Sequence, residues 1–192
     1  MPVRVGVVSI QGDFEKHIES LQRCRLPGLT AVQVRTPEDL AGVDRVIMPG
    51  GESTTVGLLM ERYGLGDALR RAASEGMPMW GTCMGMIMLA TDVEGREQYT
   101  LGLLDVTVRR NAFGAQVHSF EDEVAMAGLD APVLGVFIRA PIVSRVGPAV
   151  EELARYDGKV VAVRQGNLIG TSFHPELTPD TRLHRWFATF GV

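Results

Sequence analysis

At 192 residues, with 45% hydrophobic and 22% charged residues, the chain has the size and composition of one globular domain spanning residues 1–192. Its formal net charge is −4 and no basic cluster stands out, which argues against a nucleic-acid-binding protein. The N-terminal apolar stretch is too short for a signal peptide or a membrane span, and two cysteines without a disulfide or metal-ligand pattern favour a cytoplasmic protein.

Short apolar runs alternate with helical patterns through the first half of the chain. The expected elements are a strand at 3–10, a helix opened by Gly12–Asp13 that carries Cys24 on its apolar face, strands at 30–35 and 44–51, helices at 53–64 and 66–75, and a strand from 77. Ser53 or Thr54 is expected to cap the helix at 53–64. This alternation predicts an α/β fold with a parallel sheet covered by helices on both faces.

The second half is rich in strand patterns. They occupy 99–110, 115–126, 132–141 and 149–174, with turn signals at Asp157–Gly158 and Gly166–Asn167, and a last helix is expected at about 180–190. The added strands predict a central sheet that is mostly parallel but mixed.

Cys83 lies between two glycines, Gly81 and Gly85, where an apolar strand pattern gives way to a helical one. Gly-x-Cys-x-Gly has the form of a nucleophile elbow, in which side chains at the glycine positions would clash across the turn. The N–H groups of a helix beginning near Met84 would favour the thiolate and could bind an oxyanion. The alternative is that Cys83 is a small buried hydrophobic residue, as free cysteine often is.

A thiol nucleophile requires a base, and His174 also follows an apolar strand pattern. Glu176, two residues later, could fix the imidazole tautomer, and Pro175 would stiffen the link between the two. The alternative is a surface turn without a partner. His17 and His184 fall within helical patterns, which favour a solvated or a packing role, and His118 stays undecided.

The sequence MPGGEST, residues 48–54, places a second glycine turn at the end of the strand at 44–51. Gly50 and Gly51 would let the backbone approach a substrate and direct N–H groups at an oxyanion. No Gly-Lys-Ser/Thr follows, so a phosphate-binding loop is not indicated. A plain strand-to-helix turn is the alternative.

These motifs resemble the class I (triad) glutamine amidotransferases, which have a flavodoxin-like α/β fold. SIQGDFEKH, MPGGESTT, GTCMGMIMLA, RRNAFGAQVHSF, FIRAP and SFHPELTPDTRLHRWF narrow the resemblance, over effectively the whole chain, to the glutaminase subunits of pyridoxal 5′-phosphate synthase. The resemblance implies hydrolysis of L-glutamine to glutamate and ammonia, delivery of the ammonia to a synthase subunit in a large hetero-oligomer for vitamin B6 biosynthesis, and no metal or bound cofactor.

The resemblance also implies roles for individual residues. Cys83 would be the nucleophile, His174 the base and then the acid, and Glu176 the orienting carboxylate. The N–H groups of Gly51 and Met84 would bind the oxyanion. The family's glutamine-binding positions match Gly51, Glu52, Ser53, Arg110, Ile138 and Arg139. A surface or interface ion pair is the alternative role for Arg139.

Two residues depart from the family pattern. Met84 follows the cysteine where a small residue is common, and Ala115 follows RNAFG where a basic residue is common. A backbone N–H at residue 84 survives the first change, whereas the side chain of Met84 bears on the shape of the pocket mouth.

Three other functions are compatible with parts of the pattern. A glutaminase subunit for another ammonia-using synthase, such as that of histidine biosynthesis, would keep the triad but should lack RNAFG and FIRAP. A protease or deglycase of the PfpI-like group would have a histidine at position 84. A catalytically silent regulatory subunit would keep the fold, but the intact triad argues against it.

Overall fold

In the computed structural model, which describes residues 2–113 and 119–191, a central sheet has the strand order β2-β1-β3-β4-β12-β11-β9-β6-β5, with β10 paired to β11. The elements in chain order are β1 (Val3–Val8), α1 (Phe14–Arg23), β2 (Leu29–Val34), η1 (Pro37–Leu40), β3 (Arg45–Met48), α2 (Ser53–Arg62), α3 (Leu65–Ser74), β4 (Met79–Thr82), α4 (Met84–Leu89), β5 (Ala90–Val93), β6 (Leu104–Arg109), β7 (Ser119–Val124), β8 (Val133–Ile138), β9 (Ile142–Val146), β10 (Glu151–Tyr156), β11 (Lys159–Gln165), β12 (Leu168–Thr171), η2 (Pro175–Leu177) and α5 (Arg182–Thr189).

The five neighbouring strands β2, β1, β3, β4 and β12 all run parallel, whereas β11 is antiparallel to β12, β9 and β10. The expectation of a mostly parallel, mixed sheet is therefore confirmed. Because adjacent parallel strands end at the same edge of the sheet, the segments that follow β1, β3, β4 and β12 are brought together.

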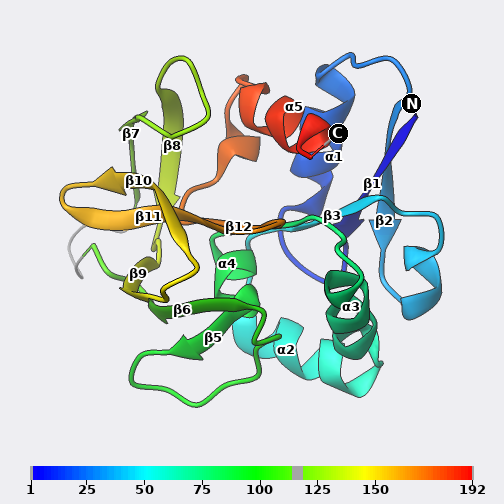
Figure 1. Cartoon of the computed structure of the whole chain (residues 1–192), viewed down its shortest axis with the longest axis horizontal. Helices are drawn as coiled ribbons and strands as arrows, with labels where there is room; N and C mark the ends of the chain where they lie inside the picture. Colours follow the sequence, from blue (N-terminus) through cyan, green and yellow to red (C-terminus); the bar gives the residue numbers. More distant parts are fainter. Residues whose placement is uncertain (1, 114–118, 192) are drawn as a thin grey trace.

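Helices cover both faces of the sheet, as the sequence predicted. Figure 1 shows α1 and α5 on one face and α2, α3 and α4 on the other. Successive side chains of a strand point to opposite faces of the sheet, so each face has its own hydrophobic core. Val46 and Met48 of β3 pack into the core under α2 and α3, and Ile47 between them packs into the core under α1 and α5.

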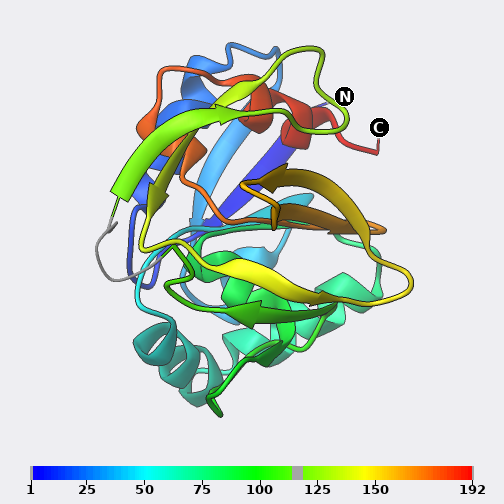
Figure 2. The ribbon, with the colours of Figure 1, turned by 90° about the vertical axis from the view of Figure 1, so that its left-hand side faces the viewer.

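β7 and β8 form a separate two-stranded antiparallel sheet on the same side as α1 and α5, as Figures 1 and 2 show. Within this small sheet Phe120 stacks on Phe137, with ring centroids 4.6 Å apart. Phe137 in turn attaches the sheet to the main body, because its ring meets that of Phe173 at 5.6 Å. Phe173 directly precedes His174, so this packing helps to place the segment after β12.

Local details both confirm and correct the expectations. The two-residue turns at Asp157–Gly158 and Gly166–Asn167 connect paired strands, as predicted. Strands β5 and β9 were missed; β5 follows α4 directly, without a glycine or proline to mark the change.

In the described part of the chain, no helix is long and apolar enough to cross a membrane.

Candidate active site

The segments after β1, β3, β4 and β12, together with those after β6 and at the end of β8, surround a pocket of about 310 Å³ at the carboxyl edge of the parallel strands. Every predicted site residue except Glu176 lines it. The lining residues are Gln11, Asp13, Gly51, Glu52, Ser53, Cys83, Met84, Ile87, Arg110, Asn111, Ile138, Arg139, Pro141 and His174. The structure therefore brings together residues that are up to 163 positions apart in the chain.

Cys83 occupies a strained turn between β4 and α4. Its φ is 50° and its ψ is −106°, a conformation that a residue with a side chain rarely adopts. The backbone N–H of Cys83 donates to the carbonyl of Thr171 at 2.8 Å, which ties the turn to β12. This geometry leaves the thiol half-buried at the pocket wall, unlike the fully buried Cys24.

The glycines on either side of Cys83 are required by space. A β-carbon on Gly81 would overlap the backbone of Gly85, and one on Gly85 would overlap the carbonyl oxygen of Met48. Close approach of α4 to β3 and β4 therefore depends on both glycines, as the elbow motif predicted. The side chain of Met84, which follows the cysteine, is buried and lines the pocket.

His174 lies at the end of β12, beside the elbow. Its backbone N–H donates to the carbonyl of Val136 at 2.8 Å, and its Nδ1 is 2.7 Å from Oε1 of Glu176. Burial by itself lowers the pKa of His174, but hydrogen bonds and charge interactions with Cys83 and Glu176 outweigh burial and raise this pKa to about 10. The side chains of His174 and Glu176 are 6% and 0% exposed, so a surface turn without a partner is wrong.

The loop after β3 contains Gly50 and Gly51, neither of which has a positive φ. Space again explains the glycines: a β-carbon on Gly50 would overlap the imidazole of His174, and one on Gly51 would lie 2.5 Å from Oε1 of Gln11. A residue that follows β1 also holds the loop after β3, because the N–H of Glu52 donates to Oε1 of Gln11 at 2.8 Å.

Glu52, rather than Ser53 or Thr54, caps α2, which corrects the expectation from sequence. Its carboxylate accepts hydrogen bonds from the backbone N–H groups of Thr54 at 3.1 Å and Thr55 at 2.8 Å. The hydrogen bond from the N–H of Thr55, with that from Thr54, lowers the pKa of Glu52 to about 2, although partial burial acts to raise it. Ser53 is the first helical residue instead.

Two arginines face the pocket. Arg110 is 3.8 Å from the carboxylate of Glu52 and donates to Oε1 of Gln98 at 3.4 Å, the same atom that accepts from Ser53 Oγ. Arg139 lines the pocket from the end of β8, is exposed and has a φ of 44°. Ile138, beside it, adds an apolar part to the same wall.

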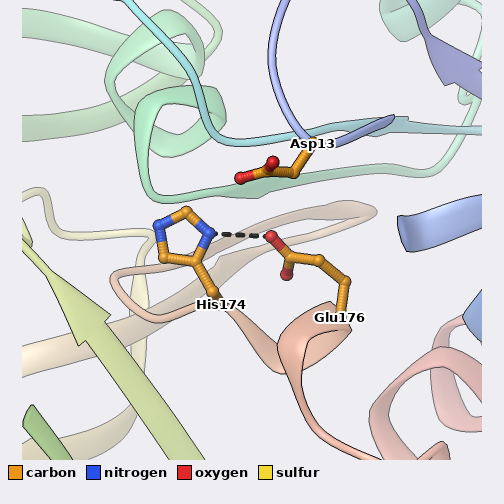
Figure 3. A group of neighbouring side chains, drawn as sticks. All are labelled: Asp13, His174 and Glu176. Atoms are coloured by element: carbon orange, nitrogen blue, oxygen red, sulfur yellow. Dashed lines mark hydrogen bonds and ion pairs between the residues drawn. The ribbon is translucent and has the colours of Figure 1, made fainter. Parts of the chain in front are cut away.

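Gln11, Asp13 and Asn111 line the pocket but were not predicted as site residues. Asp13 follows β1, and its carboxylate lies beside His174 and Glu176, with the ligand-type atoms of the three within 4.8 Å of one another (Figure 3). Such a trio could bind a metal ion. Because Nδ1 of His174 and Oε1 of Glu176 bond directly to each other, the geometry favours a hydrogen-bonded pair instead. The signal for Gln11 and Asp13 was a third glycine, Gly12, at a strand end.

The remaining histidines and cysteine divide into three cases. His17 and His184 are completely buried and hydrogen-bonded to each other at 2.9 Å, which confirms the packing role and excludes the solvated one for both. Cys24 is buried at the end of α1, which confirms its place in the core. His118 and Ala115 lie outside the described residues.

The thiol, imidazole and carboxylate lie together at neighbouring strand ends of a parallel α/β sheet. This arrangement is that of the class that the motifs predicted, the triad glutamine amidotransferases. The chain belongs to the SNO glutamine amidotransferase family, whose sequence profile matches residues 7–191. This membership confirms the resemblance drawn from the motifs.

Proteins that are similar to this chain match it over nearly its full length. The pyridoxal 5′-phosphate synthase subunit PdxT of Desulforudis audaxviator is 49% identical over 189 residues, covering 98% of each chain. The protein of the same name from Roseiflexus sp. is 53% identical, covering 95% of this chain and 97% of the relative. A crystal structure of a glutamine amidotransferase is 50% identical, with a TM-score of 0.90 over 95% of this chain and 96% of that chain. This last likeness confirms the fold class that the motifs implied.

Proposed function

We propose that the chain hydrolyses L-glutamine to L-glutamate and ammonia, and supplies the ammonia to the synthase subunit that makes pyridoxal 5′-phosphate. The observation that carries this proposal is the placing of Cys83, His174 and Glu176 at adjacent strand ends, where Cys83 and His174 line a pocket of about 310 Å³ and Glu176 is hydrogen-bonded to His174 behind them. Membership of the SNO glutamine amidotransferase family and the names of full-length relatives near 50% identity support the choice of substrate and pathway.

The proposed reaction proceeds through a thioester. Cys83 Sγ loses its proton to His174 and attacks the side-chain carboxamide carbon of glutamine. His174 returns the proton to the departing nitrogen, so ammonia leaves and a γ-glutamyl thioester remains. Water, deprotonated by His174, then attacks the thioester and releases glutamate and the thiol. Glu176 holds Nδ1–H of His174 throughout, as the 2.7 Å contact permits.

The developing oxyanion requires N–H donors. We assign this role to the backbone groups of Gly51 and Met84, since both residues line the same pocket as Cys83. Met84 is the first residue of α4, so its N–H has no acceptor within that helix. A methionine side chain does not remove a backbone donor.

The other pocket residues are suited to the polar ends of the substrate. Arg110 can bind the α-carboxylate, and the carboxylate of Glu52 supplies negative charge for the α-ammonium group. Gly51, Ser53, Ile138 and Arg139 complete the predicted glutamine-binding set. Arg139 is the more exposed of the two arginines, so we expect it to contribute less than Arg110.

The synthase subunit is expected to control this activity within a large hetero-oligomer in the cytoplasm. Free ammonia would be protonated in water and lost as a nucleophile. Glutaminase activity that depends on docking would therefore avoid hydrolysing glutamine when no synthase is present to use the ammonia. The loop at Gly50–Gly51 is the candidate switch, because its peptides can reorient at low steric cost. Two free thiols, Cys24 and Cys83, fit a reducing compartment.

A glutaminase assay with and without the matching synthase subunit tests the proposal. We expect weak activity from the chain alone and a higher kcat in the mixture, with a smaller change in KM. Cys83→Ala should abolish ammonia release, whereas Cys24→Ala, the matched control, should retain it. A glutamine-analogue electrophile should label Cys83; a silent regulatory subunit would show neither labelling nor activity. Near-normal hydrolysis by Cys83→Ala would refute the assignment.

A further inference from the structure

The carboxylate of Glu176 is buried and has two different oxygen environments. Oε1 is bonded to His174 Nδ1 at 2.7 Å, whereas Oε2 lacks a geometrically complete hydrogen bond within residues 2–113 and 119–191. A completely buried carboxylate oxygen without a donor is costly, and a carboxylate held through one oxygen can rotate. The side chain placed against Oε2 therefore determines how firmly Glu176 is held.

That side chain is His17 of α1. Its Nε2 lies 3.4 Å from Oε2 of Glu176 and 3.1 Å from Oγ1 of Thr82, the residue before Cys83. Its Nδ1 lies 2.9 Å from Nε2 of His184 on α5. The rings of His17 and Trp80 also pack in a T-shaped arrangement, with centroids 5.9 Å apart, so packing as well as polar contacts holds the His17 ring.

The hydrogen-bond partners determine the tautomer of His17. A proton on Nδ1 would point at His184 Nε2 and force the His184 proton onto its Nδ1, which has no partner in the described part of the chain. It would also leave the lone pair of His17 Nε2 facing a carboxylate. A proton on Nε2 removes the second cost and reduces the first, because His184 Nδ1 then carries a lone pair instead of a buried N–H without an acceptor. In this tautomer His184 Nε2–H donates to His17 Nδ1, and His17 Nε2–H faces Thr82 and Glu176.

We infer that His17 is a positioning residue, which holds the carboxylate of Glu176 through Oε2 and thereby fixes the imidazole of His174 for the proposed reaction. This inference rests on the proposed function. His17 touches neither the pocket nor the thiol, so it acts through Glu176. His184 acts one step further away, by holding the proton of His17 on Nε2.

Both outer histidines are suited to this role because they stay neutral. Burial, followed by the charges of His184 and His174, lowers the pKa of His17 well below its ordinary value, and burial lowers the pKa of His184 to about 3. Arg23 and Asp180 are the other charged groups that act on His184. A neutral His17 has one Nε2–H, which is hydrogen-bonded to Thr82 Oγ1 and lies 3.4 Å from Glu176 Oε2, so it places a positive dipole end beside the carboxylate without competing with His174 for its charge.

The test compares His17→Met, which keeps length but removes the donor, with His17→Gln, which keeps an N–H at similar reach. The glutaminase assay is run with the synthase subunit, and Ser20→Ala, a buried change on the same helix, is the control. We expect His17→Met to lower kcat about tenfold to a hundredfold with little change in KM, and His17→Gln to restore most of the rate. Equal losses in the two variants, with intact folding, would indicate packing and overturn the inference.

Two further measurements keep the inference testable. In a Glu176→Gln background, His17→Met should add little further loss, whereas a full additional loss would contradict coupling through the carboxylate. Alkylation of Cys83 by iodoacetamide, followed by mass spectrometry of its peptide, should shift to higher pH in His17→Met, because a loosely held Glu176 stabilises the His174 imidazolium less. An unchanged alkylation profile would count against the proposal.

The alkylation assay does not require glutamine hydrolysis. If the wild-type chain proves inactive on glutamine while the alkylation shift is present, the proposed function fails but the positioning role of His17 stands. If His17→Met does not fold, His184→Leu, which leaves His17 in place but removes the donor to its Nδ1, should show a smaller loss of kcat and the same direction of alkylation shift. Wild-type values in that variant would then overturn the inference.

Discussion

Gly50 lies so close to His174 that a β-carbon at residue 50 would overlap the imidazole ring. The glycine belongs to the loop after β3 and the histidine to the segment after β12, and the two strands are separated in the sheet by β4. The loop that is expected to bind the oxyanion therefore also limits where the proposed base can sit.

Gly50→Ala should impair catalysis through this contact. The new methyl group must displace the imidazole or the loop, and a shift of about 1 Å in a reacting group can cost about a hundredfold in rate. We expect kcat for glutamine to fall by about that factor in the presence of the synthase. Thermal unfolding of the same variant serves as the control, since a shifted site leaves the rest of the fold intact. A wild-type kcat would show that the site accommodates the methyl group.

His174→Ala and Glu176→Gln should differ in severity. Loss of the base should cost about four orders of magnitude in kcat or more, and loss of the orienting charge about a hundredfold to ten-thousandfold. The measurement is kcat at saturating glutamine with the synthase bound. An equal or larger loss in Glu176→Gln would mean that the carboxylate does more than orient His174.

Arg110→Gln should weaken glutamine binding more than it slows the chemistry. A charge-assisted hydrogen bond contributes about 1.5–3 kcal/mol, so KM should rise by about ten- to a hundredfold. Arg109→Gln is the matched control, because Arg109 is exposed and pairs with Glu94 at 3.0 Å. A smaller effect is expected for Arg139→Gln. If both Arg109→Gln and Arg110→Gln leave KM unchanged, the substrate carboxylate binds elsewhere.

Glu52→Ala should destabilise the chain in a pH-dependent way. The free energy of unfolding at pH 7 should fall by about 1 kcal/mol through loss of the cap, a modest figure because half of the Glu52 side chain is exposed to solvent. Since the pKa of Glu52 is lowered from 4.5 to about 2, its stabilising effect is present above pH 4.5 and is lost as pH falls towards 2.

Urea unfolding of wild type and Glu52→Ala between pH 7 and pH 2 measures this effect. The difference between the two should shrink as the pH falls below 4.5. Glu61→Ala, in the last turn of α2, is the control and should show no such convergence. A difference that stays constant down to pH 2 would mean that the charge of Glu52 is not what caps the helix.

The sequence by itself determined the parallel half of the fold and three of its strand ends. Apolar runs alternating with helical patterns predicted the sheet, and the glycines beside Cys83 and in the loop after β3 marked turns that have no room for side chains. The pair His174–Glu176 was visible for the same reason, since two residues on a short turn interact locally. Each of these signals depends on neighbours in the chain.

The tertiary structure decided the rest, because contacts between distant residues leave no periodic signal. His17 and His184 are 167 positions apart, and each looks like an ordinary polar residue in a helical pattern. They become buried partners because α1 and α5 pack on the same face of the sheet, next to Glu176. Asp13 reaches His174 in the same way, since β1 and β12 end at one edge. Which polar side chains meet was fixed by strand order and helix packing, which local sequence patterns do not encode.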